Sequence, residues 1–171
     1  MKKMLIVYYS WSNGNTKRIA EELQKATDAD MAGIETLVPY PEDYQTTVDQ
    51  GQREVTKGYQ PEIQPLPYDI KNYDVIAVGT PTWWYTMAPA VLTFLSSQDW
   101  NGKTVIPFMT NGGWPGHVIR DMEKACVGAA AACPLKVRFD SDGGDHQETP
   151  DSEIDNWIWS VKQLLKEESD Q

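Results

Sequence analysis

The sequence predicts an α/β protein of one domain, residues 1–171, folded as a doubly wound three-layer sandwich around a five-stranded parallel sheet. Three observations lead to this fold class. Apolar runs at 4–9, 75–78 and 104–109 suit strands that helices cover on both sides. Segments with apolar residues three and four positions apart separate these runs, as in amphipathic helices. The first run also passes directly into a turn rich in glycine and hydroxyl groups.

The remaining elements follow in chain order. A weaker strand is expected at 31–37, and an alternating run at 134–139 is typical of an edge strand. The polar segment 38–73 holds one helix, indicated by Tyr44 and Val55. Apolar stripes predict the other helices around 19–26, 88–95, 118–126 and 154–165. Right-handed crossovers in such a sheet place ligands at the carboxyl ends of the strands.

Composition narrows the possible partners. The chain has 15 basic and 25 acidic residues, and its net charge of −10 disfavours binding to nucleic acid or to an anionic membrane. A basic protein partner is consistent with this charge. Phe139 to Val161 contains no lysine or arginine, which suits either a docking patch or a solvated loop before an acidic helix start. We expect a cytoplasmic protein, either a monomer or a weak homodimer. We expect no metal site, because Cys126 and Cys133 lack metal-ligand spacing.

The turn from Ser10 to Thr16 has the layout of a phosphate cradle. It joins an apolar strand to a helix N-terminus, where unpaired amides and the helix dipole favour an anion. Gly14 lets the backbone approach closely, and the neighbouring hydroxyl groups add hydrogen bonds. The alternative is an ordinary turn in which Asn15 or Thr16 is the helix N-cap.

Two further loops leave the same predicted sheet edge. The loop from Gly79 to Pro89 places Trp83, Trp84 and Tyr85 in a normally exposed position, where a flat aromatic ligand would cover them. The loop 110–116 is rich in glycine, so its backbone can approach a polar ring edge. Together with one phosphate site, these loops favour a flavin mononucleotide. The alternative is that the three aromatic residues pack on a neighbouring helix or a dimer partner.

Nearly the whole chain resembles the flavodoxins, especially the short-chain bacterial type. The resemblance lies in Tyr-Tyr-Ser at 8–10, Tyr-Pro-Glu-Asp-Tyr at 40–44, Gly-x-Pro-x-Trp-Trp at 79–84 and the glycine pair at 112–113. It implies a flavodoxin-like strand order of 2-1-3-4-5 and non-covalently bound FMN. The cofactor-binding residues that it implies fall into three groups: Ser10, Ser12, Asn13, Asn15 and Thr16 for the phosphate; Pro81, Thr82, Trp83, Trp84 and Tyr85 beside the isoalloxazine; and Thr110, Asn111, Gly112 and Gly113 at its polar edge.

The phosphate loop departs from the usual family spacing by one extra residue around Asn13, which leaves open whether Ser10 or Ser12 bonds the phosphate. The leading functional hypothesis is an electron-transfer flavoprotein, a flavodoxin that shuttles electrons between redox proteins and needs no catalytic side chain. The alternative is an NAD(P)H-dependent FMN or quinone oxidoreductase of the same fold. A phospho-receiver module is excluded, because Tyr8, Tyr9 and Ser10 stand where its acidic residues would be.

Overall fold

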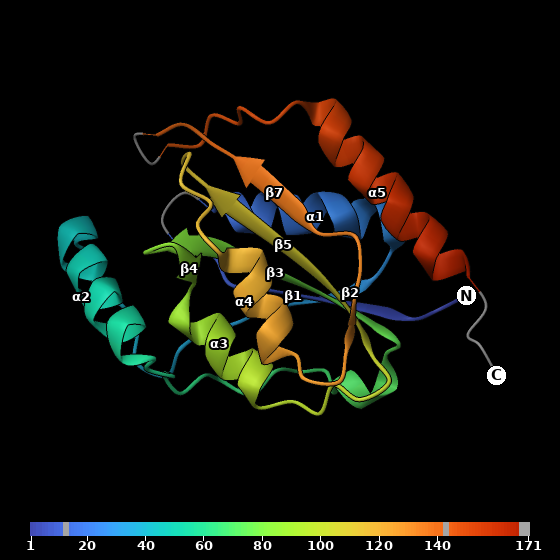
Figure 1. The fold of residues 1–171 in the computed structure, drawn as a ribbon, viewed down its shortest axis with the longest axis horizontal. Helices are drawn as coiled ribbons and strands as arrows, with labels where there is room; N and C mark the ends of the chain where they lie inside the picture. The colour runs from blue at the N-terminus through green and yellow to red at the C-terminus, as the bar shows by residue number, and fades with distance from the viewer. Residues whose placement is uncertain (12–13, 142–143, 168–171) are drawn as a thin grey trace.

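The computed structural model describes residues 1–11, 14–141 and 144–167, and it confirms the predicted fold class (Figure 1). Parallel strands form the centre of the molecule in the order β2-β1-β3-β5, with β6 and β7 both pairing with β5. The strands have these bounds: β1 Met4–Tyr8, β2 Asp30–Gly33, β3 Val75–Trp83, β4 Thr86–Met87, β5 Thr104–Asn111, β6 Ala130–Ala131 and β7 Leu135–Arg138.

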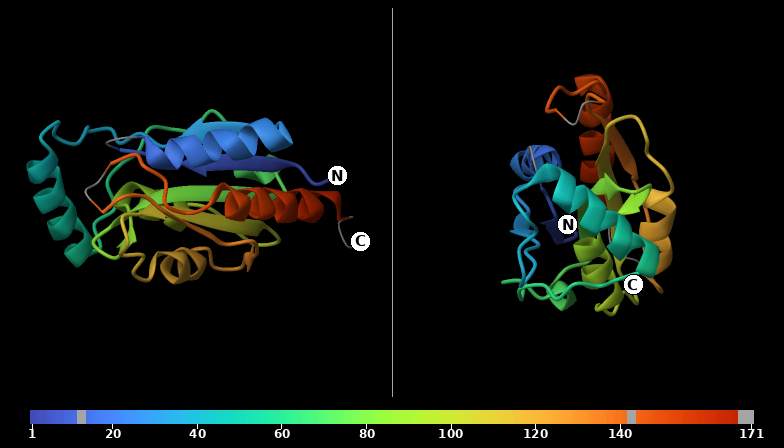
Figure 2. Two further views of the ribbon diagram at one scale, coloured as in Figure 1. Left: turned by 90° about the horizontal axis from the view of Figure 1, so that it is seen from above. Right: turned by 90° about the vertical axis from the view of Figure 1, so that its left-hand side faces the viewer.

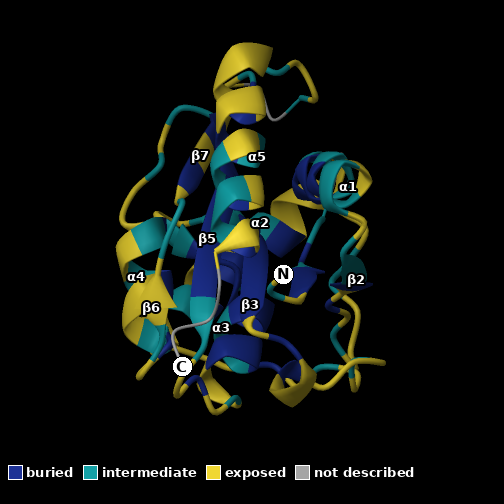
Figure 3. Ribbon diagram, turned by 90° about the vertical axis from the view of Figure 1, so that its right-hand side faces the viewer, coloured by how far each residue is buried: buried dark blue, intermediate teal, exposed yellow. Residues whose placement is uncertain are grey.

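Helices cover both faces of this sheet (Figure 2). Their bounds are α1 Asn15–Thr27, α2 Tyr44–Lys57, α3 Pro89–Ser96, α4 Val118–Ala125 and α5 Asp151–Lys166, with a 3₁₀ turn at Ile70–Asn72. Alternate residues of β1 enter two separate cores. Ile6 packs with α1 and α5, whereas Leu5 and Val7 pack with α3 and α4. The central strands are therefore buried on both faces, as Figure 3 shows.

The sheet differs in detail from the predicted five strands. The expected last strand, 134–139, is confirmed as β7, but the shorter β6 precedes it on the same edge of β5. Cys133 has a φ of 49° and Pro134 carries no N–H, so neither can continue a ladder between the two pieces. β3 also runs five residues beyond its predicted end at Val78 and turns back into β4, which pairs with it antiparallel.

Helix α2 lies beyond the carboxyl ends of the strands, to the left of the sheet in Figure 1. Asp43 caps its N-terminus by accepting a hydrogen bond from the Thr46 amide at 2.8 Å, and Gly58 ends it in the left-handed conformation. Long connections on either side tie it to the sheet. Helix α2 therefore covers one side of any ligand that binds at this edge of the sheet. In the part of the chain that the structure describes, no helix has the length and apolar character needed to cross a membrane.

Candidate functional site

A cavity of about 410 Å³ opens at the carboxyl ends of the strands, between the loops after β1, β3 and β5 and the inner face of α2. Its volume is in the range of small-molecule sites, about 300–1,000 Å³. Its lining combines the predicted loops with two further segments: Trp11, Asn15, Thr16, Tyr44, Thr47, Val48, Gly51, Pro81, Thr82, Trp83, Trp84, Thr110, Asn111, Gly112, Trp114, Phe139, Asp140, Ser141 and Gly144.

One end of the cavity is the N-terminus of α1. The N-cap is Gly14, with a φ of 73°, rather than Asn15 or Thr16, and no side chain caps the helix among the residues that the structure describes. The first-turn amides of α1 therefore have no capping side chain among the described residues, as is also the case for α3, α4 and α5. Thr16 is 1% exposed, and its hydroxyl lies 2.8 Å from that of Thr110 on β5.

Two polar atoms near this helix end have no hydrogen-bond partner among the described residues. They are Ser10 Oγ, which is buried although Ser10 is not in the cavity lining, and Asn15 Oδ1. The Asn15 amide nitrogen instead donates to the Gly144 carbonyl at 3.0 Å, which joins the loop after β7 to α1. Buried polar atoms without partners are uncommon, and they are expected where a ligand completes a site.

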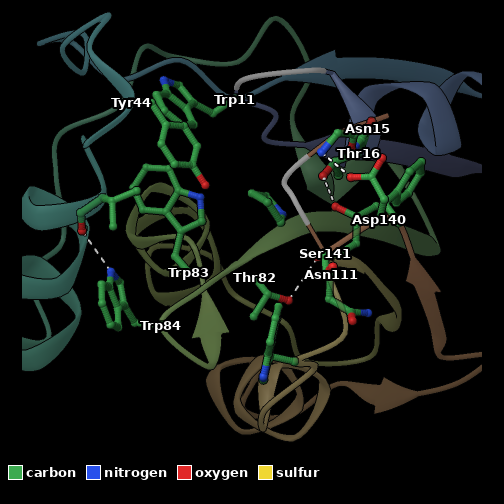
Figure 4. Close-up of a pocket in the computed structure, with 18 of the residues that line it drawn as sticks. Trp11, Asn15, Thr16, Tyr44, Thr82, Trp83, Trp84, Asn111, Asp140 and Ser141 are labelled. Carbon is green, nitrogen blue, oxygen red and sulfur yellow. Dashed lines mark hydrogen bonds between the residues drawn. The ribbon is translucent and has the colours of Figure 1, made fainter. Parts of the chain in front are cut away.

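The other end of the cavity is aromatic (Figure 4). Trp11 and Tyr44 stack with their ring centroids 5.6 Å apart, and Trp83 meets Trp11 edge-to-face at 6.1 Å. The Trp84 indole N–H donates to the Val48 carbonyl of α2 at 2.9 Å. These rings come from three separate segments, so the aromatic wall exists only in the folded protein.

The turn between β3 and β4 is strained. Trp84 and Tyr85 are its two central residues, and their φ values are 49° and 68°. A hairpin turn with two positive φ values normally selects Asn-Gly, because a β-carbon costs about 1–2 kcal/mol per residue in this conformation. Trp84 lines the cavity, but Tyr85 is 54% exposed and does not. Such strain in an aromatic turn indicates a functional constraint on this segment.

The loop after β5 is held by its own side chains. The Asn111 side-chain Nδ2 donates to the Val137 backbone carbonyl at 3.1 Å, and the Asn111 Oδ1 accepts from the Gly113 backbone N–H at 2.8 Å. Thr82 donates its hydroxyl to the Thr110 carbonyl at 3.0 Å, which fixes this loop to β3. The backbone around Gly112 therefore presents a rigid edge to the cavity.

An acidic loop closes the cavity beside α1. The Asp140 carboxylate accepts the Gly144 amide, and the Asp140 amide donates to the His146 carbonyl at 2.9 Å. This carboxylate is used within its own loop. No group of three or more histidine, cysteine or acidic side chains among the described residues is arranged to hold a metal ion.

Behind the aromatic wall lies a second, buried polar cluster. Glu54 of α2 is 8% exposed and accepts a hydrogen bond from the Tyr40 hydroxyl at 3.1 Å. Burial raises the pKa of Glu54 above its ordinary value, and the Tyr40 hydrogen bond opposes part of that rise. Burial, followed by the nearby Glu54 charge, also raises the pKa values of Tyr9 and Tyr40.

The structure brings nine of the fourteen predicted binding residues to this cavity: Asn15, Thr16, Pro81, Thr82, Trp83, Trp84, Thr110, Asn111 and Gly112. Ser10, Tyr85 and Gly113 lie outside its lining, and Ser12 and Asn13 lie outside the described residues. Sequence reasoning missed the α2 face and the 139–144 segment. Trp11 was identifiable, since it is an aromatic residue inside the proposed phosphate turn.

Comparison with known proteins agrees with this geometry. A family model described as flavodoxin matches residues 3–159. The structure of a flavoprotein from Lactobacillus acidophilus in complex with FMN is 27% identical, with 92% of this chain and 99% of that one covered and a TM-score of 0.72.

Two other solved structures extend the comparison. One from Bacteroides eggerthii is 25% identical, with 98% of this chain and 100% of that one covered and a TM-score of 0.76. A Fusobacterium nucleatum flavodoxin bound to FMN is 18% identical, with 97% and 100% covered and a TM-score of 0.55, and so shares the fold. Comparison with curated protein sequences gives no significant match.

Proposed function

This chain belongs to the flavodoxin family, and on that premise we propose that it binds FMN non-covalently and carries electrons between redox proteins. One observation carries the proposal: a single cavity joins the N-terminus of α1, which no described side chain caps, to a wall of aromatic side chains. The first feature suits a phosphate and the second a planar ring system. The FMN complex of the Lactobacillus acidophilus flavoprotein supports the same ligand.

The residues at the phosphate end fit this group. The first-turn amides of α1 and the buried Thr16 hydroxyl offer donors at a positive helix end. Ser10 Oγ, which has no partner among the described residues, supports a donor from the strand end as well. We propose that Asn15 and the residues Ser12 and Asn13 complete this phosphate cradle.

The residues at the aromatic end fit an isoalloxazine. Trp83, with Trp84 beside it, would flank the ring system, and the backbone at Gly112 would meet its polar edge. Trp11 and Tyr44 extend the apolar surface on the α2 side. Contact with these rings would cover part of the isoalloxazine and shield it from water.

Bound FMN would supply the redox chemistry itself, accepting electrons from one protein and passing them to another. The protein's residues would hold the phosphate, orient the isoalloxazine ring and shield part of it from solvent. The net charge of −10 supports a basic protein as the exchange partner, because complementary charge speeds association.

The first test is the identity of the cofactor. We expect heat or acid to release FMN, identified by mass, and the stripped protein to bind added FMN with quenching of both flavin and tryptophan fluorescence. Release of FAD, or no flavin binding after reconstitution, would overturn the proposal.

The second test separates a carrier from an enzyme. Steady-state oxidation of NADH and NADPH is measured with a quinone acceptor and with free FMN. A carrier gives turnover near background with both nucleotides, whereas sustained turnover would establish the oxidoreductase alternative.

A further inference from the structure

We propose that Glu54 is a positioning residue of the cofactor site: its buried carboxylate holds Tyr40 by the hydroxyl, and Tyr40 fixes the indole of Trp83 in the cavity wall. The effect on ligand binding rests on the proposed function. The effect on the aromatic cluster is a property of the protein alone, so the two can fail separately.

The first step concerns the unfavourable free energy of burying the Glu54 carboxylate. Glu54 is 8% exposed, its Oε1 accepts from Tyr40 at 3.1 Å, and its buried Oε2 has no partner among the described residues. A buried carboxylate with one oxygen unpaired is unfavourable, and an apolar residue would stabilise a scaffold better. Stability therefore does not explain Glu54. Gln50 and Arg53 of the same helix also lower the pKa of its carboxyl, but the Tyr40 hydrogen bond lowers it more and comes from outside the helix.

The second step is the constraint on Tyr40. This residue lies between Pro39 and Pro41, which restrict its backbone. The Thr47 hydroxyl of α2 donates to the Pro41 carbonyl at 2.7 Å, so a second hydrogen bond fixes the same segment. With its backbone held, the Tyr40 ring is oriented by its hydroxyl and hence by Glu54.

The third step joins Tyr40 to the cavity. The Tyr40 and Trp83 rings meet edge-to-face, with centroids 5.0 Å apart and planes at 73°. Tyr9 contacts Trp83 in the same way at 5.9 Å. The Trp83 indole N–H has no hydrogen bond to another described residue, so packing contacts, including those with the rings of Tyr9 and Tyr40, orient this side chain. Movement of Tyr40 would therefore change the wall that Trp83 presents.

Helix α2 closes the same contact from the other side. A β-carbon at Gly51 would lie 3.1 Å from Trp83 Cε3, so the absence of a side chain lets the helix approach the indole. Gly51 and Glu54 are three positions apart and share a helix face. One face of α2 thus packs on Trp83 and, about one turn further on, holds the tyrosine that orients it.

The experiment compares Tyr40→Phe, Glu54→Leu and their double variant with the wild-type protein. Tyr40→Phe keeps the ring and removes the donor, and Glu54→Leu removes the acceptor. We expect each to weaken FMN binding about tenfold, which corresponds to about 1.4 kcal/mol. The double variant should be no weaker than either single one, because both remove the same hydrogen bond. Glu54→Gln, which keeps an acceptor, should bind within about threefold of wild type.

A structural readout separates positioning from general damage. The near-UV circular dichroism of the FMN-free protein is recorded for wild type and Trp83→Phe, and their difference spectrum gives the Trp83 band. We expect this band to change in Tyr40→Phe and Glu54→Leu, while Glu54→Leu unfolds at the same or higher denaturant concentration than wild type.

Tyr73→Phe is the matched control, because Tyr73 is also buried and also donates its hydroxyl to a carboxylate, that of Asp30, at 2.6 Å. It should lower stability and leave FMN affinity and the Trp83 band unchanged. If Tyr40→Phe and Glu54→Leu behave like this control, or if their effects add, the positioning role is wrong. Failure of the wild-type protein to bind FMN would overturn the proposed function instead, and the Trp83 band would still decide the role of Glu54.

Discussion

The two ends of the central sheet differ in how completely their buried polar atoms are paired. At the amino end, Tyr73 donates to Asp30 at 2.6 Å, Lys103 Nζ donates to the Tyr73 carbonyl at 2.6 Å, and the Lys3 amide donates to Asp74 at 3.0 Å. At the carboxyl end, by contrast, Ser10 Oγ, Asn15 Oδ1 and Glu54 Oε2 have no partner among the described residues.

The two ends also differ in which residues adopt the left-handed region, because Asp28 and Cys133, the other described non-glycine residues with positive φ, are not aromatic and do not line the cavity. The carboxyl end has two adjacent aromatic residues in the left-handed region, Trp84 and Tyr85, and an exposed Trp114 in the cavity lining. Most proteins are only marginally stable, so such features persist where another requirement maintains them. The comparison teaches that the amino end serves the fold, whereas the carboxyl end gives up stability to keep groups free for a ligand.

The largest expected effect is a loss of FMN affinity when the phosphate cradle at the carboxyl end is altered. Thr16→Val keeps the shape of the side chain and removes its buried hydroxyl. A hydrogen bond to a charged group contributes about 1.5–3 kcal/mol, so FMN affinity should fall by about tenfold to about 150-fold. Riboflavin lacks the phosphate and should bind as well as before. Isothermal titration with both ligands checks this, and equal losses would show that Thr16 does not contact phosphate.

The central sheet is the part of the molecule that the sequence predicts best. The runs at 4–9, 75–78 and 104–109 became β1, β3 and β5 because strands buried on both faces require continuous apolar residues. β6 was missed because this strand consists only of Ala130 and Ala131, which is too short to show a periodic pattern. The β3–β4 hairpin was missed because Trp84 and Tyr85 are not residues that normally form such a turn.

The site was predicted where it follows from strand ends and missed where it follows from packing. Loops after parallel strands meet at one edge, which brought Asn15, Thr82 and Gly112 together as expected. The α2 face, with Thr47 and Gly51, depends on how a long polar segment folds back over that edge. No local sequence pattern predicts this folding back of the segment, so sequence reasoning could not assign Thr47 and Gly51 to the cavity.

The second prediction tests the amino end. Tyr73→Phe should lower the free energy of unfolding by about 2 kcal/mol, because Asp30 loses a charge-assisted hydrogen bond. FMN affinity should stay within about twofold of wild type. Urea unfolding and flavin titration measure the two quantities. A loss of FMN affinity comparable to that of Thr16→Val would contradict the separation between the two ends.

The third prediction relieves strain at the carboxyl end. Tyr85 has a φ of 68°, is 54% exposed and does not line the cavity. Tyr85→Asn should raise the free energy of unfolding by about 1 kcal/mol, since asparagine adopts the left-handed conformation at lower cost. FMN affinity should stay unchanged. Weaker FMN binding would instead place Tyr85 against the flavin, and lower stability would show that the turn is not strained.

The last and smallest effect uses pH to compare two carboxylates, Asp121 of α4 and Glu54 of α2. Asp121 of α4 accepts a hydrogen bond from Thr86 at 2.6 Å and contacts His117. Burial acts to raise its pKa, but these two contacts and the nearby Arg120 charge outweigh it and hold the pKa below 3.8. Glu54 has the opposite shift, because burial raises its pKa above 4.5.

The two shifts give stability slopes of opposite sign. The contribution of Asp121 is present above pH 3.8 and is lost as the pH falls through its lowered value, so Asp121→Asn should weaken the loss of stability in acid. The contribution of Glu54 is fully present below pH 4.5 and is lost as the pH rises through its raised value. Glu54→Gln should therefore gain stability relative to wild type as the pH rises, while it keeps the acceptor for Tyr40. Urea unfolding of both variants between pH 3 and pH 8 measures the slopes. A Glu54→Gln curve parallel to wild type would mean that this carboxylate carries no stability cost, and the case for its retention at the carboxyl end for positioning would lose its energetic basis.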